Sequence, residues 1–251
     1  MYEDRVLAKE LTEKIMSAEQ AASLIKPEMV IGCSGFTTAG FPKAVPEAVA
    51  DLGTADKLTL ITPASTGKEL DGALAKAGLV SRRYSFQSNA DMRNMINKGD
   101  LEFSDIHLSQ VPKYIDTGFL GKIDYAIIEC CQILEDCSIV PTTSLGASNN
   151  IIKFADKVIL EINTTCPVEL KGIHDVFEAP LGTYIPVYAP EDRIGSVSIP
   201  CPSEKIAAIV FSDKIGSTPV FKAPDEVSSA IAENIITFFK NEVKLGRLPE
   251  N

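Results

Sequence analysis

Nearly continuous apolar runs alternate with amphipathic segments along most of the chain. The apolar runs predict strands at residues 29–32, 57–62, 83–86, 105–108, 125–130, 157–162 and 206–211. Strands buried on both faces lose the simple alternation of apolar and polar residues, so these runs favour a parallel sheet. The segments between them have helical spacing and predict helices at residues 17–25, 42–52, 67–77, 90–97, 112–119 and 148–154. We therefore expect an α/β fold with three α/β/α layers around a mainly parallel sheet.

Two segments break this alternation. Residues 166–202 carry six of the fifteen prolines and have weak periodicity, which predicts an irregular excursion or a small antiparallel addition. Residues 225–245 predict a long amphipathic helix whose apolar stripe contains Val227, Ile231, Ile235, Phe238 and Phe239. We therefore divide the chain into a domain at residues 1–222, which includes the excursion, and a helix with a connector at residues 223–251.

A glycine-spaced loop follows the first predicted strand. From residue 32 to residue 42 its sequence is Gly-Cys-Ser-Gly-Phe-Thr-Thr-Ala-Gly-Phe-Pro. Glycine permits a positive φ and a close approach of the backbone to another group, and proline favours a helix start. We expect the loop from Gly35 to Gly40 to place backbone against a ligand, and the first amides of the next helix to hold a ligand oxygen. A plain strand-to-helix turn is the alternative, because such turns recur throughout α/β folds.

Composition and charge narrow the class of partner. The chain has 251 residues, of which 45% are hydrophobic, as expected for a folded globular unit. Its net charge of −10 argues against nucleic acid, because phosphate binding needs clustered Lys and Arg. The acidic N-terminal segment is unlike a signal peptide, and no apolar run is long enough to span a bilayer. We expect a cytoplasmic protein without a membrane partner.

The six cysteines are scattered through apolar runs and loops, without the paired spacing of metal ligands, at Cys33, Cys130, Cys131, Cys137, Cys166 and Cys201. This usage fits reduced thiols that pack as small hydrophobic side chains. Cys130 and Cys131 with Cys137 suggest a metal or redox site most strongly, but adjacent residues on a strand point to opposite faces. We therefore expect no metal site.

Several polar residues stand at the ends of predicted strands. Glu129 ends the strongest apolar run and is tempting as a nucleophile, but we interpret it as a structural carboxylate. Gln87, Ser88 and Asn163 are candidates to line a pocket or to make ordinary hydrogen bonds within loops. His107 lies in an apolar run, so we expect a hydrogen-bonded core residue there.

Four residues of the glycine loop, Gly35, Phe36, Gly40 and Pro42, follow a Gly-Phe-x-x-x-Gly-x-Pro pattern. Further motifs occur in chain order at residues 86–88, 105–109, 124–129, 135–136, 139–141 and 157–163. Through these motifs, the chain resembles the class I CoA-transferase and acetyl-CoA hydrolase family, and the likeness covers nearly the whole chain. Thr38 and Cys137 depart from the pattern, since many relatives have glycine at these places.

The resemblance implies a function that this chain does not complete alone. Members of the family are single chains roughly twice as long, with a nucleophilic glutamate in the carboxy-terminal half. We therefore expect an amino-terminal half with no catalytic residue of its own. Its expected partners are an acyl-CoA, a short-chain carboxylate such as acetate, and the absent carboxy-terminal half or subunit. We also expect a homo-oligomer that uses a CoA thioester as substrate and has no tightly bound cofactor.

The expected substrate-binding residues are Gly35, Phe36, Thr37, Thr38, Ala39, Gly40, Gln87 and Asn163. The implied reaction moves CoA through a glutamyl-CoA thioester, with water in place of the acceptor in a hydrolase. Two alternatives stay open. One is a non-catalytic module that binds CoA or a partner chain, and the other is an alpha-type subunit of a two-subunit CoA-transferase.

Overall fold

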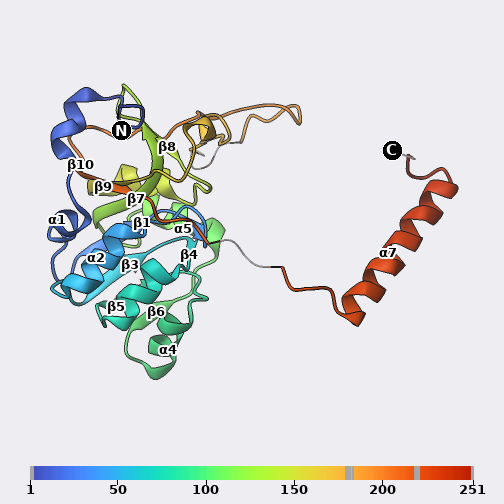
Figure 1. The fold of residues 1–251 in the computed structure, drawn as a ribbon, viewed down its shortest axis with the longest axis horizontal. Coiled ribbons are helices and arrows are strands. Elements are labelled where there is room, and N and C mark those ends of the chain that lie inside the picture. The colour runs from blue at the N-terminus through green and yellow to red at the C-terminus, as the bar shows by residue number, and fades with distance from the viewer. Residues whose placement is uncertain (1–2, 179–181, 183, 218–220, 250–251) are drawn as a thin grey trace. The chain divides into compact units, whose positions relative to one another are not determined.

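The computed structural model describes residues 3–178, 182, 184–217 and 221–249 (Figure 1). The chain divides into two compact units, Met1–Ser217 and Thr218–Asn251. The first unit contains the sheet, and the second contains the last helix.

A sheet of eight strands forms the centre of the first unit. Its main strands follow the order β10-β9-β7-β1-β3-β5-β6, and these neighbours are all parallel. They are β1 (Val30–Cys33), β3 (Leu58–Ile61), β5 (Val80–Tyr84), β6 (Glu102–Ser104), β7 (Ile123–Ile133), β9 (Ala155–Asn163) and β10 (Ile206–Ser212). The eighth strand, β8 (Ile139–Pro141), pairs with β7 in the antiparallel direction. The predicted, mainly parallel sheet is confirmed, and it brings the carboxyl ends of β1, β7 and β9 to one edge.

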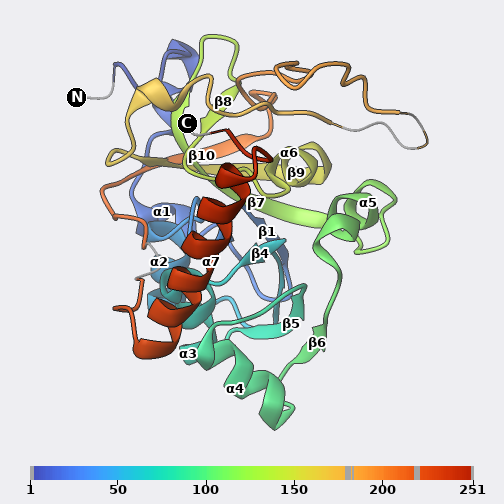
Figure 2. The same ribbon diagram turned by 90° about the vertical axis from the view of Figure 1, so that its right-hand side faces the viewer.

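Helices cover both faces of this sheet (Figure 2). One face carries α1 (Ala18–Ala22), α2 (Ala44–Leu52), α3 (Ala73–Lys76) and α4 (Ala90–Lys98), and the other carries α5 (Val111–Asp116) and α6 (Ser148–Phe154). A π-helical turn, Lys68–Gly72, leads into α3, and short 3-10 helices lie at Lys9–Lys14, Leu108–Gln110 and Val168–Leu170. The predicted helices are therefore present, with ends that differ by a few residues.

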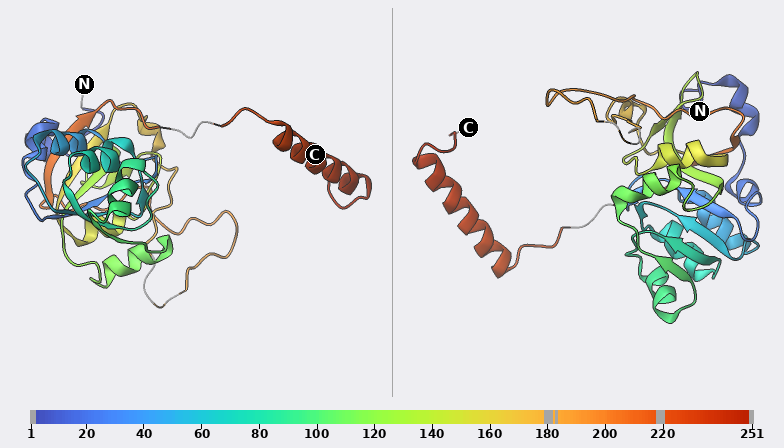
Figure 3. Two further views of the ribbon diagram at one scale, coloured as in Figure 1. Left: turned by 90° about the horizontal axis from the view of Figure 1, so that it is seen from below. Right: turned by 180° about the vertical axis from the view of Figure 1, so that it is seen from behind.

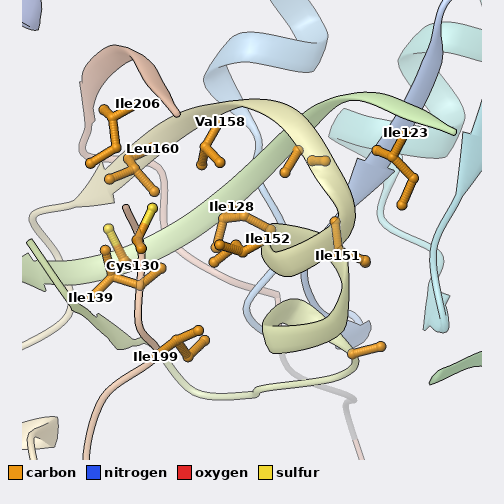
Figure 4. Packing of buried hydrophobic residues seen from close by; sticks show 14 of the residues in the cluster. Ile123, Ile128, Cys130, Ile139, Ile151, Ile152, Val158, Leu160, Ile199 and Ile206 are labelled. Atoms are coloured by element: carbon orange, nitrogen blue, oxygen red, sulfur yellow. The ribbon is translucent and has the colours of Figure 1, made fainter. Parts of the chain in front are cut away.

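Two buried clusters, one on each face of the sheet, explain why the strands read as continuous apolar runs. Adjacent residues of one strand enter different clusters, as Ile127 and Ile128 do in β7 and Ile159 and Leu160 do in β9. Ile128 and Leu160 belong to the cluster that also contains Ile152 of α6 (Figure 4). Each such side chain stabilises the fold by about 1.5–3 kcal/mol when it is fully buried. The three-layer arrangement follows from this double burial.

The prediction of a strand at residues 105–108 is wrong. The edge strand β6 lies earlier, and residues 108–110 form a 3-10 helix instead. An edge strand is half-exposed, and β6 has a single apolar side chain, Phe103, so its hydrophobic signal is weak. The buried Ile106 lies beyond the end of the strand and misled the assignment.

Two smaller corrections concern His107 and the end of β5. His107 is exposed rather than buried in the core, and its Nδ1 accepts a hydrogen bond from Ser109 N at 3.4 Å. The imidazole therefore caps the turn that follows. The strand expected at residues 83–86 is also displaced, because β5 ends at Tyr84. Gln87 consequently belongs to the loop after the strand.

The described parts of residues 166–202 are largely irregular (Figure 3). Val176 and Ser196 form an isolated antiparallel bridge, and Ile199 pairs in the same way with Ile139 of β8. The first bridge joins two parts of the excursion to each other, and the second attaches the end of the excursion to β8.

The second unit contains α7 (Glu226–Lys244), close to the helix expected at residues 225–245. The helix begins with a capping box, in which Ser228 N donates to the Asp225 carboxylate and Asp225 N donates to the Ser228 hydroxyl. Its apolar stripe is exposed. Across the described ranges of both units, no helix combines the length and the apolar character needed to cross a membrane.

Candidate functional site

The glycine loop, residues 34–41, turns sharply between β1 and α2. Gly35 and Gly40 have φ values of +110° and +65°, a region that side chains rarely adopt. A Cβ on Gly35 would lie 2.7 Å from Cβ of Phe41, and a Cβ on Gly40 would lie 2.5 Å from Oγ of Ser144. Both positions therefore need glycine for conformation and for space.

The middle of the glycine loop is exposed. Phe36 N donates to Ala39 O at 2.9 Å and Ala39 N donates to Phe36 O at 3.0 Å, which closes a tight turn. Phe36 and Thr37 form strand β2, which pairs in parallel with β4 (Ala64–Ser65). Both residues are exposed, whereas Gly35 and Gly40 are buried. Residues 36–37 are thus exposed to solvent, while the two glycines at the ends of the turn are buried.

A buried ion pair, which sequence reasoning did not anticipate, lies behind the loop. Lys43 and Glu129 are 1% and 3% exposed, and Nζ lies 2.5 Å from Oε2. Glu129 Oε2 also accepts from Asn163 Nδ2 at 3.1 Å, and Oε1 accepts from Thr142 Oγ1 at 2.8 Å. Lys43 Nζ donates in addition to Phe41 O at 2.9 Å. Protein groups therefore bond both carboxylate oxygens of Glu129, which supports a structural role for this residue.

A second buried carboxylate, Glu161, lies beside Glu129 in the register of β7 and β9. Glu161 Oε1 accepts from Lys43 N at 2.8 Å and Ala44 N at 3.0 Å, and Oε2 accepts from Val45 N at 3.0 Å. Burial raises the pKa of Glu161, the three N–H donors oppose that rise, and the Glu129 charge adds to it. The expectation that the N-terminus of α2 holds a ligand oxygen is therefore wrong, because Glu161 already occupies it.

Another buried network surrounds Asp71, in the π-helical turn before α3. Arg83 and Asp71 are both 0% exposed, with Arg83 Nε 2.9 Å from Asp71 Oδ1. Gln87 Nε2 donates to the same oxygen at 2.6 Å, and Arg83 Nη2 donates to Thr62 Oγ1 at 2.5 Å. Within the described structure Asp71 Oδ2 is buried without a hydrogen-bond partner. Burial raises the pKa of Asp71, and the Arg83 charge opposes that rise.

The predicted substrate residues fall into two groups. Gly35, Phe36, Thr37, Thr38, Ala39 and Gly40 form one continuous loop with an exposed centre. Gln87 and Asn163 are buried, and their amides bond Asp71 and Glu129 respectively. Both side chains thus support the structure behind the loop, and their contact with a substrate stays a prediction.

Ser88, the third polar candidate, is joined to the glycine loop through one residue. Its hydroxyl donates to Thr66 Oγ1 at 3.1 Å, and Thr66 N donates to Thr37 O at 2.9 Å. Ser88 is exposed. The loops after β1, β3 and β5 therefore meet at the carboxyl edge of the sheet, where open parallel sheets bind ligands.

The cysteines have the properties of packing groups. Burial raises the pKa of Cys131 to about 11 and that of Cys201 to about 12. Burial also raises the pKa of the remaining thiols, Cys33, Cys130, Cys137 and Cys166. Thiols of this kind stay protonated near neutral pH and are poor nucleophiles. The described part of the chain has no group of three or more His, Cys, Asp or Glu residues placed to hold a metal ion.

Solved structures share this fold. RipA from Yersinia pestis superimposes with a TM-score of 0.62 at 19% identity, over 89% of this chain and 48% of that chain. Glutaconate coenzyme A-transferase from Acidaminococcus fermentans superimposes with a TM-score of 0.57 at 14% identity, over 79% of this chain and 75% of that chain. At these identities the likeness concerns the fold alone, which is that of a CoA-transferase-like α/β domain.

Residues 1–210 match the Acetyl-CoA hydrolase/transferase N-terminal domain, and the chain belongs to this family. It is 40% identical over 256 residues to a succinyl-CoA:acetate CoA-transferase of Clostridium kluyveri, covering 99% of the chain and 48% of the relative. It is 38% identical over 267 residues to an acetyl-CoA hydrolase of Saccharomyces cerevisiae, covering 100% of the chain and 50% of the relative. The chain thus spans about half the length of the curated relatives it matches.

Sequence reasoning found the glycine loop and Glu129, and it missed Lys43, Glu161 and the buried pairing behind the loop. One signal was available: Glu129 and Glu161 are carboxylates inside otherwise apolar strands, which need partners when buried. A second signal was the position of Lys43, because a cation in the first turn of a helix opposes the helix dipole. Charged residues in such unfavourable places indicate a buried network.

Proposed function

We propose that this chain is the amino-terminal half of a CoA-transferase or acyl-CoA hydrolase that acts on short-chain acyl-CoA. The family match supports the class, and the names of two relatives, a CoA-transferase and a hydrolase, support both outcomes. In this proposal the nucleophilic glutamate belongs to a carboxy-terminal half outside the present chain.

The observation that carries the proposal is the glycine loop at the carboxyl edge of the parallel sheet. Its centre, Phe36 and Thr37, is exposed to a ligand, while Gly35 and Gly40 hold the turn. Acyl transfer develops negative charge on a carbonyl oxygen, and fixed backbone N–H groups stabilise such charge. In this proposal the amides of residues 35–40 that the turn itself does not use serve this task.

The proposed reaction passes through a covalent intermediate. A carboxylate oxygen of the glutamate attacks the thioester carbonyl carbon, and CoA leaves as a thiolate to give a mixed anhydride. The thiolate then attacks the glutamyl carbonyl, which releases the donor acid and forms a glutamyl-CoA thioester. An acceptor carboxylate takes the CoA by the same steps in reverse, and water takes its place in a hydrolase.

The part of this chain is to bind the thioester and the pantetheine end of CoA along residues 35–40. A net charge of −10 provides no long-range attraction for the anionic CoA. Local contacts in the loop, together with the carboxy-terminal half, therefore supply the binding. An assembly of several copies is compatible with this arrangement and stays a prediction.

An activity assay on separate and combined halves tests the proposal. The chain alone should transfer no CoA from acetyl-CoA to succinate or propionate, and it should not hydrolyse acetyl-CoA. A mixture with its cognate carboxy-terminal half should do one or the other, and comparing the two assays separates transferase from hydrolase. Robust turnover by the chain alone, abolished by Glu129→Gln, would place the nucleophile in this half instead.

The same assay separates the alternatives. Binding of CoA without turnover, even in the presence of the matching half, would indicate a non-catalytic module. Activity that appears only with a separately encoded polypeptide would indicate an alpha-type subunit.

A further inference from the structure

Lys43 is a cation enclosed at the start of a helix. Its side chain is 1% exposed, and its ammonium bonds Glu129 Oε2 and Phe41 O. The ammonium also lies 4.5 Å from the centre of the Phe41 ring. It therefore contacts the last residue of the glycine loop through both backbone and side chain.

Three successive carbonyls at the end of the loop accept hydrogen bonds from side chains. Ser144 Oγ donates to Ala39 O at 2.8 Å, Ser34 Oγ donates to Gly40 O at 2.9 Å, and Lys43 Nζ donates to Phe41 O at 2.9 Å. Ser34 in turn accepts from Glu129 N at 2.9 Å. Two of the three bonds thus lead to Glu129, one through its backbone and one through its carboxylate.

Glu129 connects this end of the loop to strand ends on both sides of β7. Its carboxylate accepts from Thr142, which follows β8, and from Asn163, which ends β9. Asn163 Nδ2 also donates to Lys214 O at 3.0 Å, after β10. The position of the loop is therefore fixed relative to the strands that form the carboxyl edge of the sheet.

We propose that Lys43 is a positioning residue, whose ammonium, held by Glu129, fixes the carbonyl of Phe41 and with it the path of the glycine loop. A buried ion pair contributes little net stability compared with apolar side chains of the same volume, because both charges lose their hydration. The pair instead supplies a directional hydrogen bond to Phe41 O, which an apolar pair could not donate. The consequence for CoA chemistry rests on the proposed function, whereas the placement of the loop does not.

Hydrogen–deuterium exchange on the 251-residue chain tests the placement directly. The variants are Lys43→Met and the charge-balanced double variant Lys43→Met/Glu129→Gln. Lys57→Met is the matched control, because its ion pair with Glu28 is exposed, with side chains 64% and 72% accessible. Exchange in residues 34–43 reports the loop, and exchange in β3 reports the stability of the sheet.

Both Lys43 variants should exchange about tenfold faster than the original chain in residues 34–43, the effect of losing one charge-assisted hydrogen bond. In the double variant no buried charge is left unpaired, so β3 should exchange at its original rate. Lys57→Met should change neither segment. If Lys43→Met does not fold, the double variant supplies the same comparison. Original protection of residues 34–43 in the double variant would overturn the proposal and leave Lys43 with a merely structural role.

Kinetics on the protein that joins this chain to a carboxy-terminal half form a separate arm. Lys43→Met/Glu129→Gln should lower kcat about tenfold or more with little change in KM for the acceptor acid, because a displaced loop mainly weakens transition-state contacts. An equal rise in KM with unchanged kcat would contradict this role. Absence of CoA chemistry in the original protein would remove the proposed function, and the exchange experiment would still decide the placement of the loop.

Discussion

The ion pairs Asp71–Arg83 and Lys43–Glu129 are both buried near the carboxyl edge of the sheet, but they connect different parts of the chain. Asp71 and Arg83 are 12 residues apart in sequence, and Asp71 Oδ2 has no hydrogen bond in the described structure. Lys43 and Glu129 are 86 residues apart, and both oxygens of Glu129 are bonded. The first pair thus joins neighbouring elements, whereas the second joins a loop to distant strands.

Because of this difference, the effect of a buried pair on folding stability can be distinguished from its effect on the position of the glycine loop. Breaking either pair leaves a charge buried without its partner, which is destabilising wherever it happens. The pair of Lys43 and Glu129 hydrogen-bonds to the glycine loop, at Phe41 O and through Ser34. The side chains of Asp71 and Arg83 instead bond Gln87 and Thr62. We therefore expect both pairs to matter for folding, and one of them to matter for the site.

The largest expected effect is on the pair that does not contact the loop. Arg83→Met leaves Asp71 buried and unpaired, and should lower the free energy of unfolding by about 3–5 kcal/mol. Arg82→Met is the matched control, because Arg82 and Glu102 form an exposed pair that contributes at most about 1 kcal/mol. Urea denaturation measures both values. Equal small losses in the two variants would show that burial of the Asp71 pair is unimportant.

The next effect concerns Gly40, one of the two buried glycines of the loop. Gly40→Ala places a Cβ 2.5 Å from Ser144 Oγ and 2.9 Å from Ser144 O, whereas a Cβ on Gly78, with φ of +69°, meets nothing within 4 Å. Both variants bear the cost of a left-handed alanine, about 1–2 kcal/mol. Gly40→Ala should cost about 1–3 kcal/mol more by crowding, and it should impair CoA transfer in the complete protein. Equal stability and full activity in both variants would reduce the loop to an ordinary turn.

A smaller effect is a change in the pH dependence of stability. The pKa of Glu161 is raised above its ordinary value of 4.5, so the folded chain holds this proton more tightly than the unfolded chain. The stabilisation is complete below that ordinary value and is lost as the pH rises through the raised value. Glu161→Gln removes this contribution, which has a slope of at most about 1.4 kcal/mol per pH unit. Denaturation profiles from pH 4 upward that run parallel in the two proteins would refute the assignment.

The smallest effect is expected at Cys137, where φ is +66°. A left-handed backbone of this kind favours glycine. Cys137→Gly should therefore be more stable than Cys137→Ala by roughly 1 kcal/mol, the reverse of the usual order. Thermal denaturation of the two variants measures the difference. An alanine variant that is the more stable of the two would exclude backbone strain at this position.

The layers of the fold follow from the sequence because burial on both faces leaves a strong local pattern. Ile127 and Ile128 could be assigned to a central strand without knowing their neighbours, since both are apolar. The edge strand β6 could not, because one apolar residue, Phe103, does not fix a register. Local patterns therefore define the centre of the sheet better than its edge.

The candidate site was only half predictable for a related reason. Gly35 and Gly40 predict a turn by themselves, because glycine readily adopts backbone conformations that other residues avoid. The role of Lys43 depends on Glu129, which is distant in sequence, and a lysine is usually exposed. Gln87 and Asn163 were correctly placed just after or at strand ends, but their buried partners could be found only in the folded chain.

The most direct test of the account is the location of the covalent intermediate. The protein that joins this chain to a carboxy-terminal half is incubated with acetyl-CoA, and borohydride then reduces any enzyme thioester to an alcohol that survives digestion. Peptide mass mapping identifies the modified glutamate. We predict a modified glutamate outside residues 1–251, with Glu129 and Glu161 unmodified. A reduced glutamate within this chain, at Glu129 above all, would contradict the account.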